Sequence, residues 1–379
     1  MATRRKSKRA SAAAPAKTAA TAAAGMGGSK TYCSLREPTT RAFPPGVAGE
    51  RLSLLRTNGD KWVNGTLLRY AFFPSSGSFK AWAGNDALKS QVRKAIKQWT
   101  SLGIGLRFEE VQDRAQAQVR IGFLADDGHW SYVGRQIEKQ GVNDRTLNLD
   151  PSDNISTGQY GVDVASHELG HTMGFPHEHQ NPKAGIVWNE EAVYAALAAP
   201  PNNWDRDKTF FNIIRKIPPD QVQGSTWDPN SIMHYPFGAG LIQEPAEYRT
   251  GLNPPGGISA RDIEWIKSFY PALTKKDEAE LPLLETARLS IAPGAQKNFL
   301  LKPKATRNYQ IGTFGTSDTV MVLYQRESDG SERYLTADDD GGQDRNASIV
   351  LRLQAGSTYV LRVRLYYARD AGETALMWW

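Results

Sequence analysis

The sequence predicts an α+β protein with two folded units. The first is a twisted sheet with helices packed on it, and the second is a small antiparallel β-sandwich. The 379 residues are enough for two domains of ordinary size. Strand and helix patterns alternate up to about residue 271, and short alternating strands follow after residue 280. With 40% hydrophobic and 23% charged residues, the composition is that of a soluble globular chain.

The first unit is predicted from two strands and three helices. Period-two alternation indicates strands over 67–73 and 118–123, and helical spacing indicates helices over 87–102, 160–173 and 258–270. Gly174 and Pro176 stop the second helix, and Ser259 is a suitable N-cap for the third.

The second unit is predicted from four strands over 308–314, 319–325, 347–353 and 358–365. Turns rich in Asp and Gly separate these strands, the clearest being 338–342. Such short alternating strands are typical of a β-sandwich of about 100 residues. The charged run 275–280 reads as a linker.

The net charge of +6 comes from the N-terminal arm. Residues 1–36 carry eight Lys and Arg and no acid, which leaves 38 basic and 40 acidic residues in the remainder. An arm rich in Ala, Ser and Lys buries little apolar surface and is expected to be disordered. One alternative function is binding of nucleic acid through this arm. The near-neutral net charge of the remaining residues disfavours this alternative.

Membrane and export signals are not found in the sequence. No apolar run approaches the 18 or so residues of a membrane span. Residues 10–28 lack the continuous apolar run of a secretory signal, so export by the ordinary route is not predicted. Cys33 is the single cysteine and therefore excludes any intramolecular disulfide.

The motif His167-Glu168-Leu169-Gly170-His171 predicts a metal site on a helix. Positions four apart return to nearly one helix face, so His167 and His171 can direct two imidazoles at one ion. Glu168 can then reach a water on that ion without being a ligand. The alternative is a buried polar helix that binds no metal. In that case the two imidazoles and the carboxyl group would each need another hydrogen-bond partner in the protein interior.

A third ligand is predicted at His177. Gly174 has no Cβ and can adopt positive φ, which would turn the chain and bring His177 back toward the metal. Three neutral histidines leave a fourth position for water, as catalytic zinc requires. The sequence therefore predicts Zn²⁺ with catalytic use.

The pattern HExxHxxGxxH resembles the zinc signature of the metzincin metallopeptidases. The segment Ser231-Ile232-Met233-His234-Tyr235 resembles their Met-turn. Glu178, directly after the third histidine, and the form of the turn resemble the astacin branch. The likeness includes residues 128–135 and extends loosely from about Lys61 to Pro271.

The resemblance implies a role for each matching residue. It implies that Glu168 is the general base, that Met233 forms an apolar floor under the metal, and that Tyr235 is a switchable ligand. It implies an edge strand that binds extended polypeptide substrates at Trp130, Ser131 and Tyr132. Glu178 matches the acid that interacts with the new amino terminus after activation. The family usually has two disulfides, and His129 stands where a cysteine often precedes the Trp-Ser-Tyr segment.

We hypothesise that the chain is a zymogen in which Cys33 blocks the metal. Cys33, a soft ligand suited to zinc, would cap the metal until cleavage between about Gly49 and Lys61 by an activating protease. The alternative for Cys33 is an unpaired thiol in a loose segment. Extracellular location is implied by the family resemblance alone.

The expected organisation has four parts. They are a disordered basic arm and pro-segment (1–50), an astacin-like zinc peptidase domain (51–272), a linker (273–284) and a β-sandwich accessory domain (285–379). The sandwich resembles bacterial pre-peptidase C-terminal domains. Asp338, Asp339 and Asp340 could hold Ca²⁺, although any hairpin turn uses such residues.

The predicted function is that of a zinc-dependent endopeptidase that hydrolyses peptide bonds of extended polypeptides. The first alternative is a non-catalytic zinc protein that acts through its C-terminal sandwich. Glu168 and Tyr235 disfavour this alternative, because neither is needed merely to hold a metal.

Overall fold

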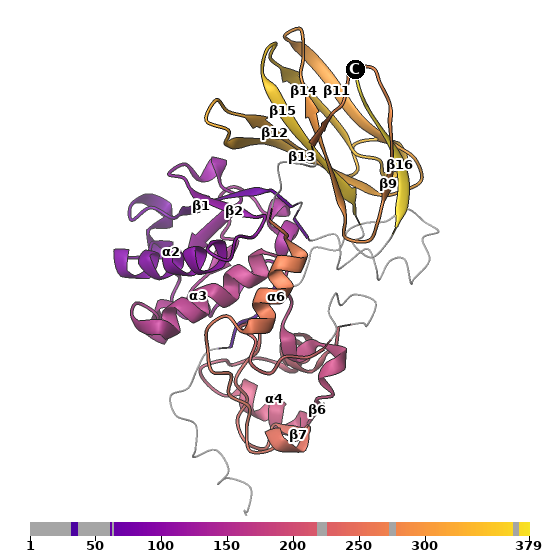
Figure 1. Cartoon of the computed structure of the whole chain (residues 1–379). Helices are drawn as coiled ribbons and strands as arrows, with labels where there is room; N and C mark the ends of the chain where they lie inside the picture. Colours follow the sequence, from indigo (N-terminus) through magenta and orange to yellow (C-terminus); the bar gives the residue numbers. More distant parts are fainter. Residues whose placement is uncertain (1–31, 37–60, 63, 218–225, 273–277, 367–370) are drawn as a thin grey trace, which may run out of the picture.

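A computed structural model describes residues 32–36, 61–62, 64–217, 226–272, 278–366 and 371–379 of the chain. The sandwich lies above the first unit in Figure 1, and α6 leads toward it. Among the described residues, no helix combines the length and apolar character needed to span a bilayer. The α+β class is confirmed, with a mixed sheet and helices followed by two sheets whose strands pair antiparallel except for one parallel pair.

The sheet of the first unit has five strands in the order β2-β1-β3-β5-β4. Its strands are β1 (Leu67–Phe72), β2 (Arg107–Glu110), β3 (Val119–Gly122), β4 (Trp130–Ser131) and β5 (Leu147–Asn148). β1, β2, β3 and β5 are parallel, and β4 pairs antiparallel with β5 at the sheet edge. An edge strand leaves one row of backbone groups for a further strand.

Three helices pack with this sheet, each within two residues of its predicted bounds. They are α2 (Asp86–Thr100), α3 (Gly158–Thr172) and α6 (Ala260–Phe269). α2 and α3 share a core that includes Trp99 and Leu169. Ser259 caps α6 as predicted, in a capping box with Asp262.

A smaller subdomain follows α3 and has its own core around Trp188, Trp204 and Phe237. It contains β6 (Val187–Trp188), α4 (Glu190–Ala198), α5 (Arg206–Thr209) and β7 (Ile242–Glu244). β6 and β7 pair antiparallel. Sequence analysis predicted none of these elements, because each is short and lacks a sustained period.

The second unit is a sandwich of two sheets, with orders β13-β12-β15-β10-β8 and β14-β11-β16-β9. The predicted strands correspond to β11 (Arg307–Phe314), β12 (Thr319–Arg326), β14 (Ser348–Leu353) and β15 (Thr358–Leu365). The others are β8 (Glu278–Glu280), β9 (Ala287–Ile291), β10 (Gln296–Leu301), β13 (Glu332–Asp338) and β16 (Gly372–Trp378).

Two segments differ from the predicted boundaries. β8 lies inside the predicted linker 273–284, because it pairs with β10 and Leu281 enters the sandwich core. Residues 32–36 lie inside the arm predicted to be disordered, yet Cys33 is buried in the core of the small subdomain. The rest of the predicted arm and pro-segment lies outside the described residues.

Buried arginines join the sandwich to the first unit. Arg362 donates to the Gly65 carbonyl at 2.9 Å, and Arg364 donates to the Lys61 carbonyl. Both side chains come from β15 and are almost fully buried. Because each guanidinium donates a hydrogen bond to backbone of the first unit, the two units share a packed interface.

Candidate active site

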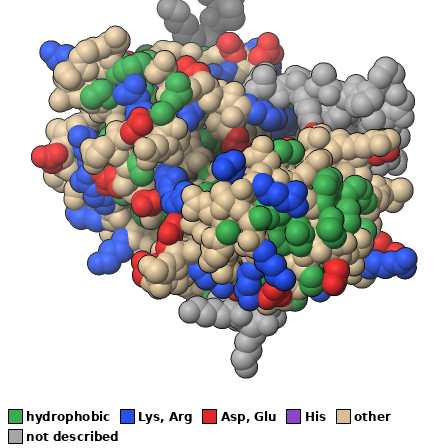
Figure 2. Space-filling view, turned by 90° about the horizontal axis from the view of Figure 1, so that it is seen from above, with side chains coloured by type: hydrophobic (Ala, Val, Ile, Leu, Met, Phe, Trp, Pro, Cys, Tyr) green, Lys and Arg blue, Asp and Glu red, His purple; other side chains and the backbone are tan. Residues whose placement is uncertain are grey.

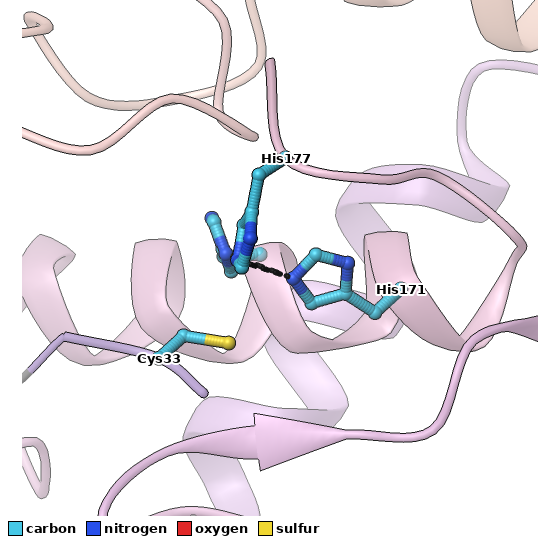
Figure 3. Close-up of side chains that lie close together, drawn as sticks. Cys33, His171 and His177 are labelled. Atoms are coloured by element: carbon cyan, nitrogen blue, oxygen red, sulfur yellow. Dashed lines mark hydrogen bonds between the residues drawn. The ribbon is translucent and has the colours of Figure 1, made fainter. Parts of the chain in front are cut away.

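Helix α3 carries the first two histidines and the acid of the predicted motif. His167, Glu168 and His171 are all buried. The helix ends where Gly174 adopts φ +97°, as predicted, and the Phe175 N–H donates back to the Gly170 carbonyl at 3.0 Å. The turn brings His177 alongside His171 (Figure 3).

The three predicted ligands converge through their Nε2 atoms. His171 Nε2 lies 3.1 Å from Nε2 of His167 and 3.1 Å from Nε2 of His177. Nδ1 of His167 lies 2.7 Å from the Ile232 carbonyl, and Nδ1 of His171 lies 2.6 Å from the Phe175 carbonyl. A carbonyl only accepts, so both Nδ1 atoms carry the proton and both Nε2 atoms present a lone pair.

This arrangement fits a zinc ion. Two facing lone pairs cannot hydrogen-bond to each other, and a cation between them removes the conflict. Ligands at about 2.0 Å from a tetrahedral zinc lie about 3.3 Å apart, close to the observed separations. The carbonyls that bind Nδ1 fix the two tautomers in the way that outer partners orient metal-binding histidines.

Burial keeps these histidines neutral. It lowers the pKa of His167 to about 4 and holds the pKa of His171 and His177 well below the usual value, with the neighbouring histidines adding to the effect. Nδ1 of His177 is buried without a hydrogen-bond partner in the described part of the chain. Neutral imidazole is the form that binds a metal.

Glu168 is buried beside this cluster. Burial raises the pKa of Glu168 to about 8, although a hydrogen bond from Cys33 opposes the shift. A carboxyl group with its pKa in this range can exchange a proton near neutral pH.

The segment predicted as a Met-turn lies against α3. Met233 is buried, and its sulfur lies so close to Gly170 that a Cβ there would meet it at 2.3 Å. The Tyr235 hydroxyl contacts His177 Nε2 and donates to the Cys33 carbonyl at 2.8 Å. The structure thus places the phenol at the histidine cluster.

Asp262 supports this segment, and sequence analysis missed the role. Its carboxylate accepts from Ser231 Oγ at 2.6 Å and from the Ile232 N–H at 2.8 Å. Ile232 in turn supplies the carbonyl that orients His167. Nothing local in the sequence links Asp262 and α6 to the turn, so this role could not be predicted.

Cys33 reaches the same cluster from the N-terminal segment. Its sulfur and one nitrogen of each of the three histidines all lie within 4.8 Å of one another, and Figure 3 shows the sulfur directed toward the histidines. The thiol donates to Glu168 Oε2 at 3.5 Å. Burial and the nearby Glu168 raise the pKa of the Cys33 thiol well above its usual value.

Residues around Cys33 follow the edge strand. The Ser34 N–H donates to the His129 carbonyl at 3.0 Å, immediately before β4. The Arg36 guanidinium lies 4.1 Å from the Trp130 ring centroid and pairs with Asp127 at 3.5 Å. Trp130 and Ser131 are buried, and the Tyr132 N–H donates to the Thr146 carbonyl.

Glu178 lies near the turn rather than among the histidine nitrogens. Its carboxylate accepts from the Asp228 N–H at 3.0 Å and from Asn181 at 3.2 Å. Burial raises the pKa of Glu178 to about 7. Its backbone N–H donates to the Met233 carbonyl, which ties the third histidine to the turn.

The remaining histidines have partners of their own. His129 Nδ1 accepts from the Asp150 N–H, and its Nε2 lies 3.1 Å from Asp153. His179 and His234 each bond to a backbone carbonyl. None of the three belongs to the cluster that could hold a metal in the described part of the chain.

The acidic turn of the sandwich gives no support for calcium. The Asp338 carboxylate accepts from the N–H groups of Gly341 and Ser348, as a hairpin turn requires. Asp339 pairs with Arg135 at 3.4 Å. Over the described ranges, this turn does not form a group of metal-ligating atoms.

Comparisons with known proteins agree with the geometry. Residues 78–241 match the family described as Astacin (Peptidase family M12A). Over 234 residues the chain is 25% identical to zinc metalloproteinase nas-36 of Haemonchus contortus, a match that covers 60% of this chain and 33% of that protein. Protein SpAN of Strongylocentrotus purpuratus is 25% identical over 201 residues, covering 50% of this chain and 29% of SpAN.

A solved structure of myroilysin is similar in fold. It is 28% identical and has a TM-score of 0.50, and the match covers 57% of this chain and 97% of that chain. The curated relatives are much longer than the matched region, which spans about a third of their length.

Proposed function

The first folded unit of this chain is an astacin-like metzincin domain, and on this premise we propose that the protein is a zinc-dependent endopeptidase. The observation that carries the proposal is the convergence of three neutral imidazoles, through Nε2, beside a buried carboxyl group. Zinc held there would supply Lewis-acid activation of a scissile carbonyl and of a water molecule.

Glu168 acts as the general base and proton carrier. It holds a proton at a carboxylate oxygen and passes it to the leaving amine. Its raised pKa, caused by burial, suits both directions of transfer near neutral pH. The Tyr235 hydroxyl donates a hydrogen bond to the developing oxyanion. Such a bond stabilises the transition state by roughly 2.7 to 4 kcal/mol in comparable sites.

The substrate is an extended polypeptide that pairs with β4. Main-chain bonding to an exposed strand edge selects extended peptide over folded surface. The bond from Ser34 N–H to the His129 carbonyl supports this role, because a segment of the chain itself already uses the same edge. Trp130, Ser131 and Tyr132 line that edge in this proposal, and Met233 and Gly174 keep the ligands in place.

Residues 32–36 act as the blocking part of a pro-segment. Their support is the position of Cys33 at the histidines and the pairing of Arg36 with Asp127. An activating protease cuts between about Gly49 and Lys61, and Glu178 then interacts with the new amino terminus. Extracellular action belongs to the same proposal.

A non-catalytic zinc protein acting through the sandwich is the weaker candidate, because Glu168 and Tyr235 both lie at the cluster. A nucleic-acid function is weaker too. On the face seen in Figure 2, Lys and Arg side chains are interspersed with Asp and Glu, unlike a continuous basic footprint.

The test compares cleavage of casein by the processed chain, by the same chain after chelation, and by Glu168→Gln. We expect cleavage only by the zinc-loaded wild type, with equal zinc content in the variant. Equal cleavage by Glu168→Gln would contradict the assigned base.

A further inference from the structure

A cavity of about 400 Å³ opens beside the catalytic residues. We propose that this cavity is a specificity subsite that binds a Lys or Arg side chain flanking the scissile bond, with Asp163 as the ion-pair partner. The inference rests on the proposed peptidase function and names its substrate class: polypeptides cleaved next to a basic residue.

The position of Asp163 follows from the helix that carries the histidines. Asp163 precedes His167 by four residues, so the two lie on one face of α3, about 6 Å apart along its axis. His167 and Glu168 also line the cavity. A side chain that enters it therefore belongs to a substrate residue adjacent to the reacting bond.

The described wall of the cavity has carboxyl groups but no Lys or Arg to pair with them. No Lys or Arg is among the described residues that line it, and its two carboxyl groups are those of Asp163 and Glu168. In the described part of the chain, the Asp163 carboxylate accepts a hydrogen bond from Gln159 Nε2 at 2.9 Å and has no ion pair. A carboxylate has about four acceptor positions, so it can take a cation as well.

The rest of the wall suits the stem of a long basic side chain. Tyr160, Val164, Pro254 and Pro255 offer apolar surface along the cavity. Lys and Arg bury their methylene groups on such surface while the charged head finds a partner. An acidic side chain would face the Asp163 carboxylate with no Lys or Arg in the described wall to pair with it, which disfavours its binding.

Gly256 permits the close approach of the opposite wall. Its φ is +82°, and a Cβ there would lie 2.6 Å from Asp163 Oδ2. A larger residue at this position would press on the carboxylate that we assign to substrate recognition. The glycine therefore leaves this side of Asp163 open to the cavity, which it also lines.

The test uses the full chain, folded intact and then cut at a protease site engineered between Gly49 and Lys61. Four peptides are compared that differ only at one residue flanking the scissile bond: Lys, Arg, norleucine or Glu. Norleucine keeps a straight aliphatic chain like that of lysine but carries no charge. Mass spectrometry identifies the bond cut, and kcat/KM is measured for each peptide.

We expect kcat/KM for the Lys and Arg peptides to exceed that for norleucine about fivefold or more, since one charge-assisted hydrogen bond is gained. Asp163→Asn should bring the ratio close to one while norleucine cleavage is retained. Asp163→Lys should give the Glu peptide a higher kcat/KM than the Lys peptide. Asp344→Asn, an exposed acid of the sandwich with the same charge change, should keep the wild-type ratio.

A second readout does not depend on turnover. Fluorescence anisotropy of the same peptides on the Glu168→Gln chain should show tighter binding of Lys than of norleucine, and Asp163→Asn should abolish the difference. Equal binding and equal cleavage of both peptides by wild type would overturn the subsite. Selective binding without any cleavage by wild type would overturn the peptidase proposal and leave the subsite supported.

Discussion

The sulfur of Cys33 lies 3.5 Å from Oε2 of Glu168, across 135 positions of sequence. The thiol therefore engages the proposed general base as well as approaching the histidines. In the proposed pro-segment, one small side chain would block both the metal position and the proton carrier, and it would do so without any change in the histidines.

Cys33→Ala should raise the peptidase activity of the uncleaved chain by about tenfold or more, the change expected when about 1.4 kcal/mol of blocking contact is lost. Ser34→Ala is the matched control, because the bond described for Ser34 comes from its backbone N–H. The measurement is cleavage of a quenched peptide before any processing. Unchanged latency in Cys33→Ala would remove the blocking role.

Tyr235→Phe should lower kcat by about 10²-fold to 10³-fold and change KM little, because the hydroxyl is proposed to act on the developing oxyanion. The phenol ring is buried beside His177 and His179, so its packing is retained. Steady-state kinetics of the processed variant provide the measurement. An active Tyr235→Phe enzyme with full kcat would contradict the assignment.

The sequence predicted the elements with long periodic patterns. α2, α3 and α6 and the strands β11, β12, β14 and β15 lie close to their predicted ranges, because each has a sustained hydrophobic period. The short elements β6, α4, α5 and β7 were missed. They are held by tertiary contacts of Trp188 and Trp204 that no local pattern reveals.

The site divides in the same way. The placement of His167 and His171 on one helix face follows from their spacing in the sequence. The turn after the helix follows from the glycine at position 174, and its observed φ of +97° agrees with that prediction. The roles of Asp262 and Asp163 depend on which distant segments pack together, namely α6 on the turn and loop 253–256 on α3. Such contacts arise only in the folded chain.

Lys61 should make stability depend on pH above neutrality. Burial, with the nearby Arg364, lowers the pKa of Lys61 to about 7, while an unfolded lysine titrates at about 10.4. Between pH 7 and 10 the unfolded state binds more protons, so the free energy of unfolding rises with pH.

Lys61→Met should flatten that rise and increase the free energy of unfolding at pH 7 by about 2 to 4 kcal/mol. Urea denaturation at pH 7 and pH 9 is the measurement. The same pH dependence in wild type and Lys61→Met would show that Lys61 is not the titrating group.

Glu332 should be important for the joint between the two units. Its carboxylate lies 2.7 Å from Arg362, 3.0 Å from Arg326 and 3.5 Å from Arg107, which belongs to β2. Glu332→Gln leaves the buried Arg362 without its counter-charge and should cost about 3 kcal/mol.

Glu280→Gln is the control, because Glu280 pairs with Lys302 where both side chains are about half exposed. It should change the free energy of unfolding by less than about 0.5 kcal/mol. Thermal unfolding of both variants compares the two. Equal, small losses would show that the Glu332 cluster does not stabilise the joint.

The central claim is that His167, His171 and His177 hold one zinc ion beside Glu168. Elemental analysis of the purified chain, set beside His171→Ala and Glu168→Gln, tests it most directly. We predict one zinc per chain in wild type and in Glu168→Gln, and a large loss in His171→Ala. Wild-type protein that contains no stoichiometric metal and takes up none would contradict the account.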